Sequence, residues 1–279
     1  MAIINQVKTA LLLGALTGLL LLIGNFWGTS GLVIGLIFAV VMNFGAYFFS
    51  DRIALAMYRA KPATEKDQPE LYKIIREVTH LANVPMPKVY IIPSESPNAF
   101  ATGRNPQHAA IAATQGILNL LSREELKGVI AHEIAHIKNR DILIASVAAT
   151  IAGVISFVAN MAQFSLFFGG DREGEGANTI GILILAILTP IIAMIIQLAI
   201  SRSREYLADD TGAKIIKNPG ALAEALSKLD ASIKKSPMRF GNPSTAHLFI
   251  ANPFSAKGIA SLLSTHPPME ERVRRLRAL

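Results

Sequence analysis

The stretch SREELKGVIAHEIAHIKN, residues 122–139, has the pattern of a long buried helix. Ser122 is followed three residues later by Glu125, which predicts a capping box at the helix start. The apolar side chains recur at helical spacing and predict a buried face that consists of Leu126, Val129, Ile130, Ile134 and Ile137. Only Gly128 interrupts residues 126–146, so we expect the helix to run on toward the apolar segment that follows.

Two histidines lie four positions apart on this helix. At 3.6 residues per turn, His132 and His136 stand about 40° apart around the axis and roughly 6 Å apart along it, so both imidazoles can converge on one ion. Glu133 projects beside them, which completes the H-E-x-x-H arrangement that holds zinc next to a catalytic base. The motif therefore indicates a metallopeptidase. The alternative is that both histidines only pack in the core and lie four positions apart by chance.

The apolar residues, 51% of the 279, are clustered along the chain rather than periodic. A hydrocarbon core of about 30 Å needs roughly 20 apolar residues. Four segments meet this requirement, namely residues 7–26, 31–49, 142–168 and 180–200. We therefore expect four transmembrane helices in two hairpins, within residues 1–60 and 142–200. No small-x-small cleavage pattern follows the first span, so we interpret it as retained and not as a signal peptide.

Basic residues flank these spans on one side and predict the orientation of the chain. They are Lys8 before the first span, Arg52, Arg59 and Lys61 after the second, Lys138 and Arg140 before the third, and Arg202 and Arg204 after the fourth. Loops rich in basic residues stay on the cytoplasmic side of a membrane. We therefore expect a multi-pass protein of the cell membrane, with both termini and the H-E-x-x-H helix in the cytoplasm.

The net charge of +7 does not indicate nucleic-acid binding, because the basic residues form no patch interleaved with aromatic side chains. Anionic headgroups of the lipid bilayer are the simpler partner. The chain has no cysteine, which excludes disulfides and thiolate zinc ligands.

The remaining residues, 61–141 and 201–279, should form one cytoplasmic domain that the second hairpin splits. Helices are predicted over 69–81, 219–233 and 268–279, and strands over 88–92 and 109–113. The turn-rich segment 98–106 and the apolar segment 238–258, which has two Asn-Pro pairs, are interpreted as loops. The predicted fold class is mainly α, with an α+β zincin-like domain whose small sheet lies beside the zinc helix.

A catalytic zinc site generally has three protein ligands and one open position, so a third ligand must come from elsewhere. Glu205 is the best candidate, and Asp209 shares its helical face at i, i+4. Asp209 can then accept a hydrogen bond from a ligating histidine. The alternative is that both acids are solvated and pair with Arg202 or Arg204.

Four motifs together resemble the HtpX family of membrane-embedded zinc metalloproteases, over essentially the whole chain. They are His132-Glu133-x-x-His136, Glu205-x-x-x-Asp209, Asn98-Ala99-Phe100-Ala101-Thr102-Gly103, and Thr265-His266-Pro267-Pro268 followed by Glu271-Arg272. The larger CAAX prenyl proteases are related but have more membrane spans. The resemblance implies one Zn²⁺ per chain, with Glu133 as the catalytic base and a ligand set of His132, His136 and Glu205.

The resemblance also implies a second electrophile and a substrate-binding edge. His266 would be the electrophile, helped at the oxyanion by Arg272, although a turn residue at a helix start fits His266 as well. An extended substrate would be added as a strand beside residues Asn98, Ala109, Ile111 and Ala113.

The metal should lie within roughly 10 Å of the bilayer surface, because His136 and Glu205 are six and five residues from the third and fourth spans. We expect both ligand-bearing helices to continue unbroken into those spans. Substrates should then be membrane proteins or unfolded chains near the membrane, and resemblance adds that they are misfolded or damaged. Two alternatives remain open, a zinc-binding scaffold without turnover and a prenyl-peptide protease, which the span count disfavours.

Overall fold

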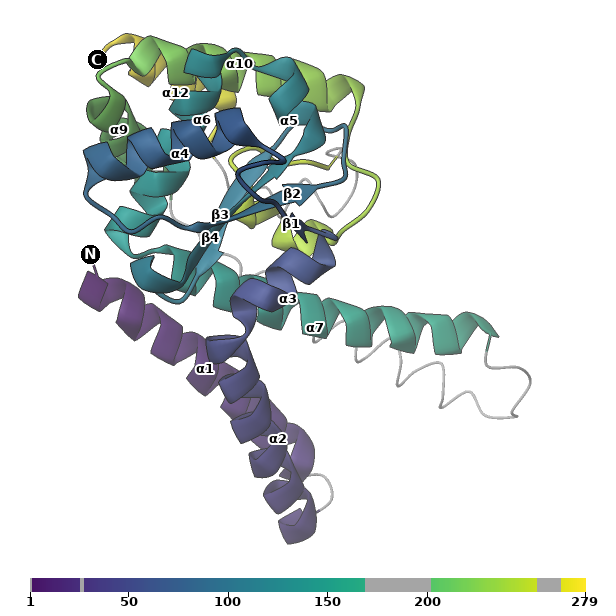
Figure 1. Cartoon of the computed structure of the whole chain (residues 1–279). Helices are drawn as coiled ribbons and strands as arrows, with labels where there is room; N and C mark the ends of the chain where they lie inside the picture. The colour runs from purple at the N-terminus through teal and green to yellow at the C-terminus, as the bar shows by residue number, and fades with distance from the viewer. Residues whose placement is uncertain (1, 26–27, 169–201, 255–266) are drawn as a thin grey trace.

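The computed structural model describes residues 2–25, 28–168, 202–254 and 267–279, drawn in colour in Figure 1. Its α-helices are α1 (Ala2–Asn25), α2 (Gly28–Phe48), α3 (Ser50–Met57), α4 (Pro69–Ala82), α5 (Gln115–Leu120), α6 (Arg123–Asn139), α7 (Ile142–Phe168), α9 (Arg202–Ile216), α10 (Pro219–Lys235) and α12 (Met269–Arg277). The strands are β1 (Lys61–Pro62), β2 (Lys88–Ile92), β3 (Ala99–Gly103) and β4 (Ala109–Thr114), and the 3-10 helices are η1 (Pro106–His108) and η2 (Pro243–Leu248).

Helices α1 and α2 form a hairpin that extends away from the rest of the chain (Figure 1). They approach closely at Gly35, where an added Cβ would lie 2.7 Å from the carbonyl oxygen of Leu20. Both helices contain stretches long and apolar enough to cross a membrane, Asn5–Leu22 and Gly28–Phe48.

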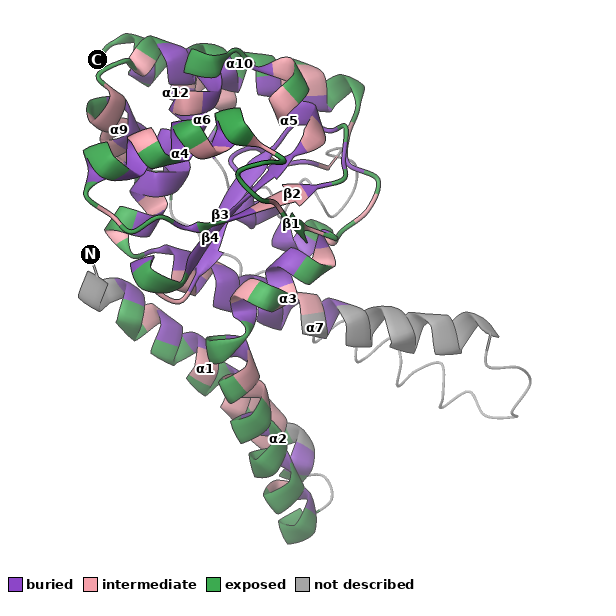
Figure 2. Cartoon of the chain, in the orientation of Figure 1, coloured by how far each residue is buried: buried purple, intermediate pink, exposed green. Residues whose placement is uncertain are grey.

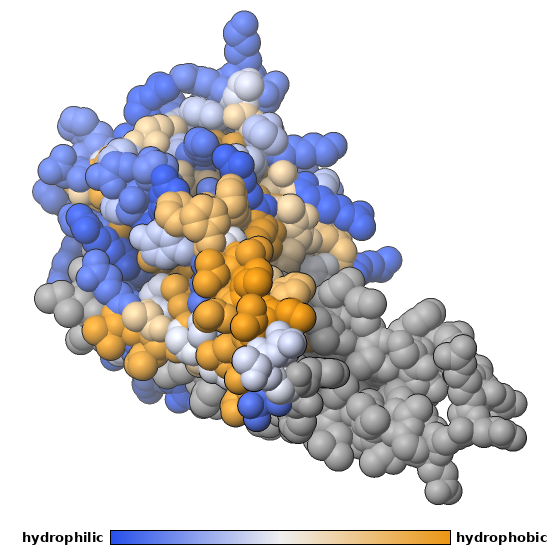
Figure 3. All heavy atoms as spheres, turned by 90° about the horizontal axis from the view of Figure 1, so that it is seen from below, coloured by the Kyte–Doolittle hydropathy of each residue, from blue (hydrophilic) through white to orange (hydrophobic). Residues whose placement is uncertain are grey.

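Large apolar side chains of α2 lie exposed along the hairpin, which is mostly green in Figure 2 and orange in Figure 3. Val40, Val41 and Phe38 are each about 60% exposed, at 62%, 62% and 59%. A contiguous apolar surface of this kind is unfavourable in water and typical of a segment that contacts lipid. The first predicted hairpin is therefore present as two apolar helices.

The third predicted span coincides with α7, which covers Ile142–Phe168. Its first half is buried against the protein, where Val147, Ala148 and Ile151 pack with Leu12 and Leu16 of α1. The fourth predicted span, residues 180–200, lies outside the described residues.

The expectation that the histidine-bearing helix continues unbroken into the third span is wrong. Helix α6 ends at Asn139, Arg140 adopts a left-handed conformation with φ of 58°, and α7 begins at Ile142. The amides of Arg140 and Asp141 bond back to the last turn of α6, to the carbonyl oxygens of Ile137 and His136. These bonds close the helix and turn the chain before α7 starts.

The four strands form a mixed sheet in the order β1-β2-β4-β3. The predicted strands, now β2 and β4, pair in parallel with Lys88 opposite Ala110, whereas β3 runs antiparallel to β4 with Ala101 opposite Ile111. Strand β3 was not predicted from the sequence, because its residues lie in a segment rich in turn-forming residues. That strand forms one edge of the sheet.

The sheet buries a different core on each face (Figure 2). Toward α4, α6, α10 and α12 it contributes Val89, Ala101 and Ile111, and toward α3 and α7 it contributes Phe100 and Ala112. Helix α6 begins with the predicted capping box, in which the Ser122 and Glu125 side chains each accept from the other residue's backbone N–H. All five residues of the predicted buried face of α6 are buried.

Candidate metal centre

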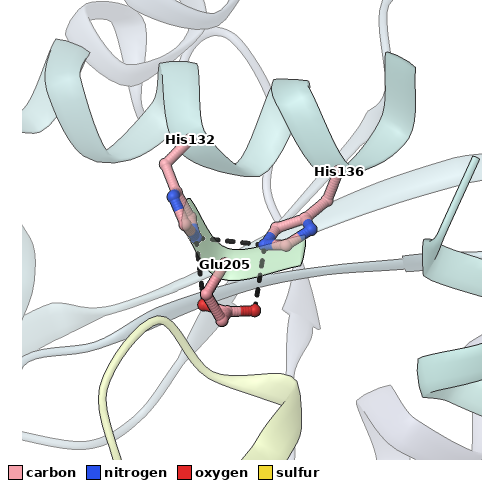
Figure 4. Close-up of side chains that lie close together, drawn as sticks. All are labelled: His132, His136 and Glu205. Atoms are coloured by element: carbon pink, nitrogen blue, oxygen red, sulfur yellow. Dashed lines mark hydrogen bonds and ion pairs between the residues drawn. The ribbon is translucent and has the colours of Figure 1, made fainter. Parts of the chain in front are cut away.

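Three side chains from two helices converge at the centre of the domain (Figure 4). Nε2 of His132 and Nε2 of His136 lie 3.0 Å apart. The Glu205 carboxylate oxygens lie 3.7 Å from His132 Nε2 and 3.6 Å from His136 Nε2. Donor atoms about 2.1 Å from a tetrahedral zinc ion are separated by roughly 3.4 Å, so this spacing fits a metal.

The opposite side of each imidazole faces a carboxylate. Nδ1 of His132 lies 2.9 Å from Asp209, and Nδ1 of His136 lies 3.1 Å from Asp141. Since a carboxylate only accepts hydrogen bonds, Nδ1 carries the proton in the neutral tautomer of each ring. Both Nε2 lone pairs then point at each other and at Glu205, an arrangement that a cation between them would stabilise.

The electrostatics of the site also favour a cation. Burial would lower the pKa of His136, but the carboxylates of Asp141, Glu205 and Glu133 outweigh it and raise the pKa to about 10. Burial lowers the pKa of His132. A cation bound between the two rings would be stabilised by the surrounding acids, Asp141, Glu205 and Glu133.

Helix α9 presents Glu205 and Asp209 to α6 because the two helices pack closely at Gly212. A Cβ at Gly212 would lie 2.9 Å from the backbone nitrogen of His132. Any larger residue would push α9 away from the histidines. The alternative in which Glu205 and Asp209 are solvated is therefore wrong, because they are 8% and 2% exposed.

Arg272, for which the resemblance implies support of an oxyanion, holds Asp209 and has one terminal nitrogen 3.7 Å from the Glu205 carboxylate. Its Nε and one terminal nitrogen donate to the two oxygens of Asp209 at 2.8 and 2.7 Å. Its other terminal nitrogen donates to the carbonyl oxygen of Ile250 at 2.8 Å. The guanidinium is fully buried and positions Asp209, which in turn positions His132.

Two residues of the site, Asp141 and Arg204, were not predicted from the sequence. Asp141, five residues after His136, is turned toward that ring by the break between α6 and α7; an acid directly after the helix end was the available signal. Arg204 lines the cavity with one terminal nitrogen buried and without a hydrogen-bond partner among the described residues. Nothing in its spacing indicated that placement.

Glu133 lies beside His136 and Glu205 with its side chain buried. Burial, followed by the nearby Glu205 carboxylate, raises the pKa of Glu133 to about 7, although the neighbouring His136 works in the other direction. One carboxylate oxygen has no hydrogen-bond partner in the described part of the chain. A carboxylate with a pKa near neutrality and an unused oxygen is suited to accept a proton.

A small cavity of about 40 Å³ opens beside these residues. It is lined by Ala101 of β3, Glu133, His136, Glu205 and by residues 247–250. This volume holds a water molecule but not a peptide.

The expected substrate edge at Ala109, Ile111 and Ala113 is wrong. Their strand β4 is hydrogen-bonded to β2 on one side and to β3 on the other, so no further strand can be added there. The sheet edge that lies beside the candidate metal site belongs to β3. The first residues of this edge are hydrogen-bonded to residues 250 and 251 of the same chain. Ile250 N–H donates to Ala99 O at 3.1 Å, and Asn98 Nδ2 donates to Ala251 O at 2.7 Å. His266 lies outside the described residues.

Comparisons with known proteins agree with this geometry. Residues 65–279 match the pattern described as Peptidase family M48. The chain is 55% identical over 280 residues to a protease HtpX homolog of Syntrophobacter fumaroxidans, covering 99% of each chain. It is 56% identical to a protease HtpX homolog of Persephonella marina, covering 98% of this chain and 96% of the relative.

A crystal structure of S. mikatae Ste24p shares the fold, with a TM-score of 0.54 and 22% identity. The similarity covers 98% of this chain but 66% of that larger one. Because the family pattern spans most of the chain and these relatives are more than half identical, the chain belongs to peptidase family M48 and is a metalloprotease.

Proposed function

We propose that this chain is a zinc endopeptidase that binds one Zn²⁺ through His132, His136 and Glu205. The observation that carries the proposal is the convergence of two imidazole lone pairs and a carboxylate, with both other ring nitrogens held by Asp209 and Asp141. Two histidines and one carboxylate form a ligand set that catalytic zinc sites use, with a position left for water.

Zinc, when bound, supplies a Lewis acid that acidifies water and polarises a peptide carbonyl. Glu133 is the general base, because its raised pKa and unpartnered oxygen let it take a proton from the attacking water. Glu133 then delivers that proton to the departing amine nitrogen. Asp209 and Asp141 keep both imidazoles in the ligating tautomer throughout.

The substrate would bind as an extended chain along the outer edge of β3, where Ala101 lines the cavity beside Glu133. Asn98 and Ala99 would contact it only after residues 250 and 251 withdraw from that edge. The 40 Å³ cavity supports this step, because it has no room for a peptide while those residues are in place.

We propose further that the chain crosses the cell membrane four times, with its protease domain, residues 61–141 and 201–279, in the cytoplasm. The apolar surface of α1 and α2 and the basic residues that follow the hairpin support this topology. Because only two residues separate the end of α6 from the start of α7, the active site lies close to the bilayer. Misfolded membrane proteins and other unfolded chains held near the membrane are the substrates that this location favours.

The test is the substitution Glu133→Gln in the full-length protein, with Glu124→Gln on the same helix as the matched control. Glu133→Gln should abolish cleavage of an unfolded, membrane-tethered polypeptide while zinc content stays at one per chain. Glu124 is an exposed residue of the first helical turn, so Glu124→Gln should change neither.

Persistent cleavage by Glu133→Gln would remove the proposed mechanism. A wild-type protein that binds zinc but cleaves nothing would favour the scaffold alternative. A prenylated peptide should be cut no faster than its unmodified counterpart, and a strong preference for it would favour the prenyl-peptide alternative.

A further inference from the structure

A second cavity, of about 430 Å³, lies where the α1–α2 hairpin meets the rest of the chain. Its lining comes from both hairpin helices, from the start of α7, from the residues after β3 and from the residue that ends α6. It shares none of its lining residues with the metal centre. The proposed peptidase reaction does not use it.

Two arginines line this cavity. Arg104 directly follows β3, and Arg140 is the left-handed residue that ends α6. Neither guanidinium pairs with a carboxylate anywhere in the described ranges. Arg104 instead stacks over the ring of Phe48 at the end of α2, 5.5 Å from the ring centroid. Two unpaired cations on one cavity form a site for an anion.

The rest of the lining is amphipathic. The amide side chains of Asn5 and Gln6 and the phenol of Tyr47 lie with the arginines, and Leu13, Leu143 and Ile144 supply apolar surface. Asn5 also binds α1 to the end of α6, because its Nδ2 donates to the carbonyl oxygen of Arg140 at 3.3 Å. An anion with an attached hydrocarbon chain matches this combination of groups.

We propose that this cavity binds the phosphate headgroup of an anionic membrane phospholipid, with Arg104 and Arg140 as the phosphate contacts. The inference rests on the proposed membrane placement of α1 and α2, but not on the proposed catalysis. Basic pockets between membrane helices at the headgroup level bind anionic lipids in this way. The apolar lining next to the arginines provides surface for the first part of an acyl chain.

The site joins the two elements that surround the metal centre. Arg104 follows the edge strand β3, and Arg140 follows the helix that carries His132 and His136. One phosphate held by both arginines would fix the end of β3 relative to the end of α6. Lipid binding should therefore raise the thermal stability of the protein as well as occupy the cavity, by mass action on the folded state.

The experiment compares the full-length protein with the double variant Arg104→Gln/Arg140→Gln. Binding is measured by native mass spectrometry of detergent-solubilised protein titrated with phosphatidylglycerol, with phosphatidylcholine, or with inorganic phosphate alone. Flotation with vesicles of either lipid reports membrane association separately. Since each arginine near anionic lipid contributes about 1 kcal/mol, the double variant should bind phosphatidylglycerol about 30-fold more weakly.

The matched control is Arg52→Gln/Arg59→Gln. Arg52 also stacks on a phenylalanine, Phe49 at 5.5 Å, and Arg59 is also left-handed, with φ of 53°. Both follow the same membrane hairpin but do not line the cavity. The control should bind phosphatidylglycerol within about twofold of the wild-type protein.

Three results would overturn the proposal. The double variant could bind phosphatidylglycerol as the wild-type protein does, or the control pair could lose binding equally, which would mean a diffuse charge effect. Inorganic phosphate could bind as tightly as the lipid, which would make the cavity a free-anion site. If the protein floated with no vesicle, the membrane placement of the hairpin would be contradicted. That result differs from loss of phosphatidylglycerol binding alone, which would contradict only the lipid site.

Discussion

Nδ1 of His136 lies 3.1 Å from each carboxylate oxygen of Asp141, although Asp141 stands outside the helix that carries the histidine. The left-handed residue Arg140 makes this contact possible, because it turns the chain back toward the last helical turn. The helix break thus has a direct consequence for the metal centre. It supplies the partner that fixes the tautomer of His136, a candidate metal ligand.

Replacing Asp141 with Asn should weaken zinc binding about 10-fold to 100-fold, the usual effect of losing a carboxylate behind a ligating histidine. The affinity is measured by competition with a chromogenic chelator. Asp210→Asn is the control, because Asp210 follows Asp209 on α9 without belonging to the site. Equal zinc affinity in the Asp141 variant and the wild-type protein would show that the ring needs no such partner.

Replacing Gly212 with Ala should disturb the same centre from the other helix. The new Cβ would lie 2.9 Å from the backbone nitrogen of His132, so α9 must shift and carry Glu205 with it. We expect a destabilisation of about 1–3 kcal/mol together with weaker zinc binding. Gly220→Ala is the control, since the nearest atom there lies 3.6 Å from the added Cβ. Unchanged zinc affinity in the Gly212 variant would contradict the close packing of α6 and α9.

Replacing Arg272 with Met should leave the buried carboxylate of Asp209 without its cationic partner, although its contact with Nδ1 of His132 would remain. The predicted loss of unfolding free energy is about 3–5 kcal/mol, because Arg272 is fully buried and makes two hydrogen bonds to Asp209. The double variant Arg272→Met/Asp209→Asn should recover part of that stability, which is measured by thermal unfolding. Arg275→Met serves as the control on α12, since Arg275 is exposed and stacks on Tyr206. Equal stability of the two single variants would exclude a structural role for the buried pair.

The contribution of Glu125 to the stability of the fold should depend on pH. Burial opposes its ionisation, but Lys228 and the Ser122 cap outweigh burial and hold the pKa of Glu125 below its ordinary value of 4.5. A carboxyl whose pKa is lowered on folding stabilises the fold above that ordinary pKa, and the stabilisation disappears as the pH falls through the folded-state pKa.

Glu125→Gln should therefore be less stable than the wild-type protein at pH 7 and equally stable once the pH is below the lowered pKa. Thermal unfolding of both proteins between pH 3 and 7 measures this difference. Glu124→Gln, at an exposed position one residue earlier, should show no such trend. A constant difference between Glu125→Gln and wild type across the range would mean that the charge of Glu125 is not the cause.

The sequence predicted those parts of the fold whose signal is local. Helix α6 could be predicted because a capping box marks its start and its apolar residues recur with the helical period. Strands β2 and β4 could be predicted as short apolar runs. The pair of histidines and the acid at position 205 were readable too, since metal ligands need particular residue types at particular spacings. The structure then brings these three side chains together.

Other features depend on contacts between distant residues, and no local pattern specifies them. Strand β3 lies between turn-forming residues, and it becomes a strand because β4 offers it hydrogen-bonding partners. The role of Arg272 follows from packing α12 against α9, 63 residues away along the chain, where burial makes Asp209 its necessary partner. The sequence by itself determined the candidate metal ligands and the apolar hairpin, through residue type and periodicity. Only the tertiary structure decided which strand forms the edge and which charges lie behind the ligands, because burial and pairing are properties of the assembled core.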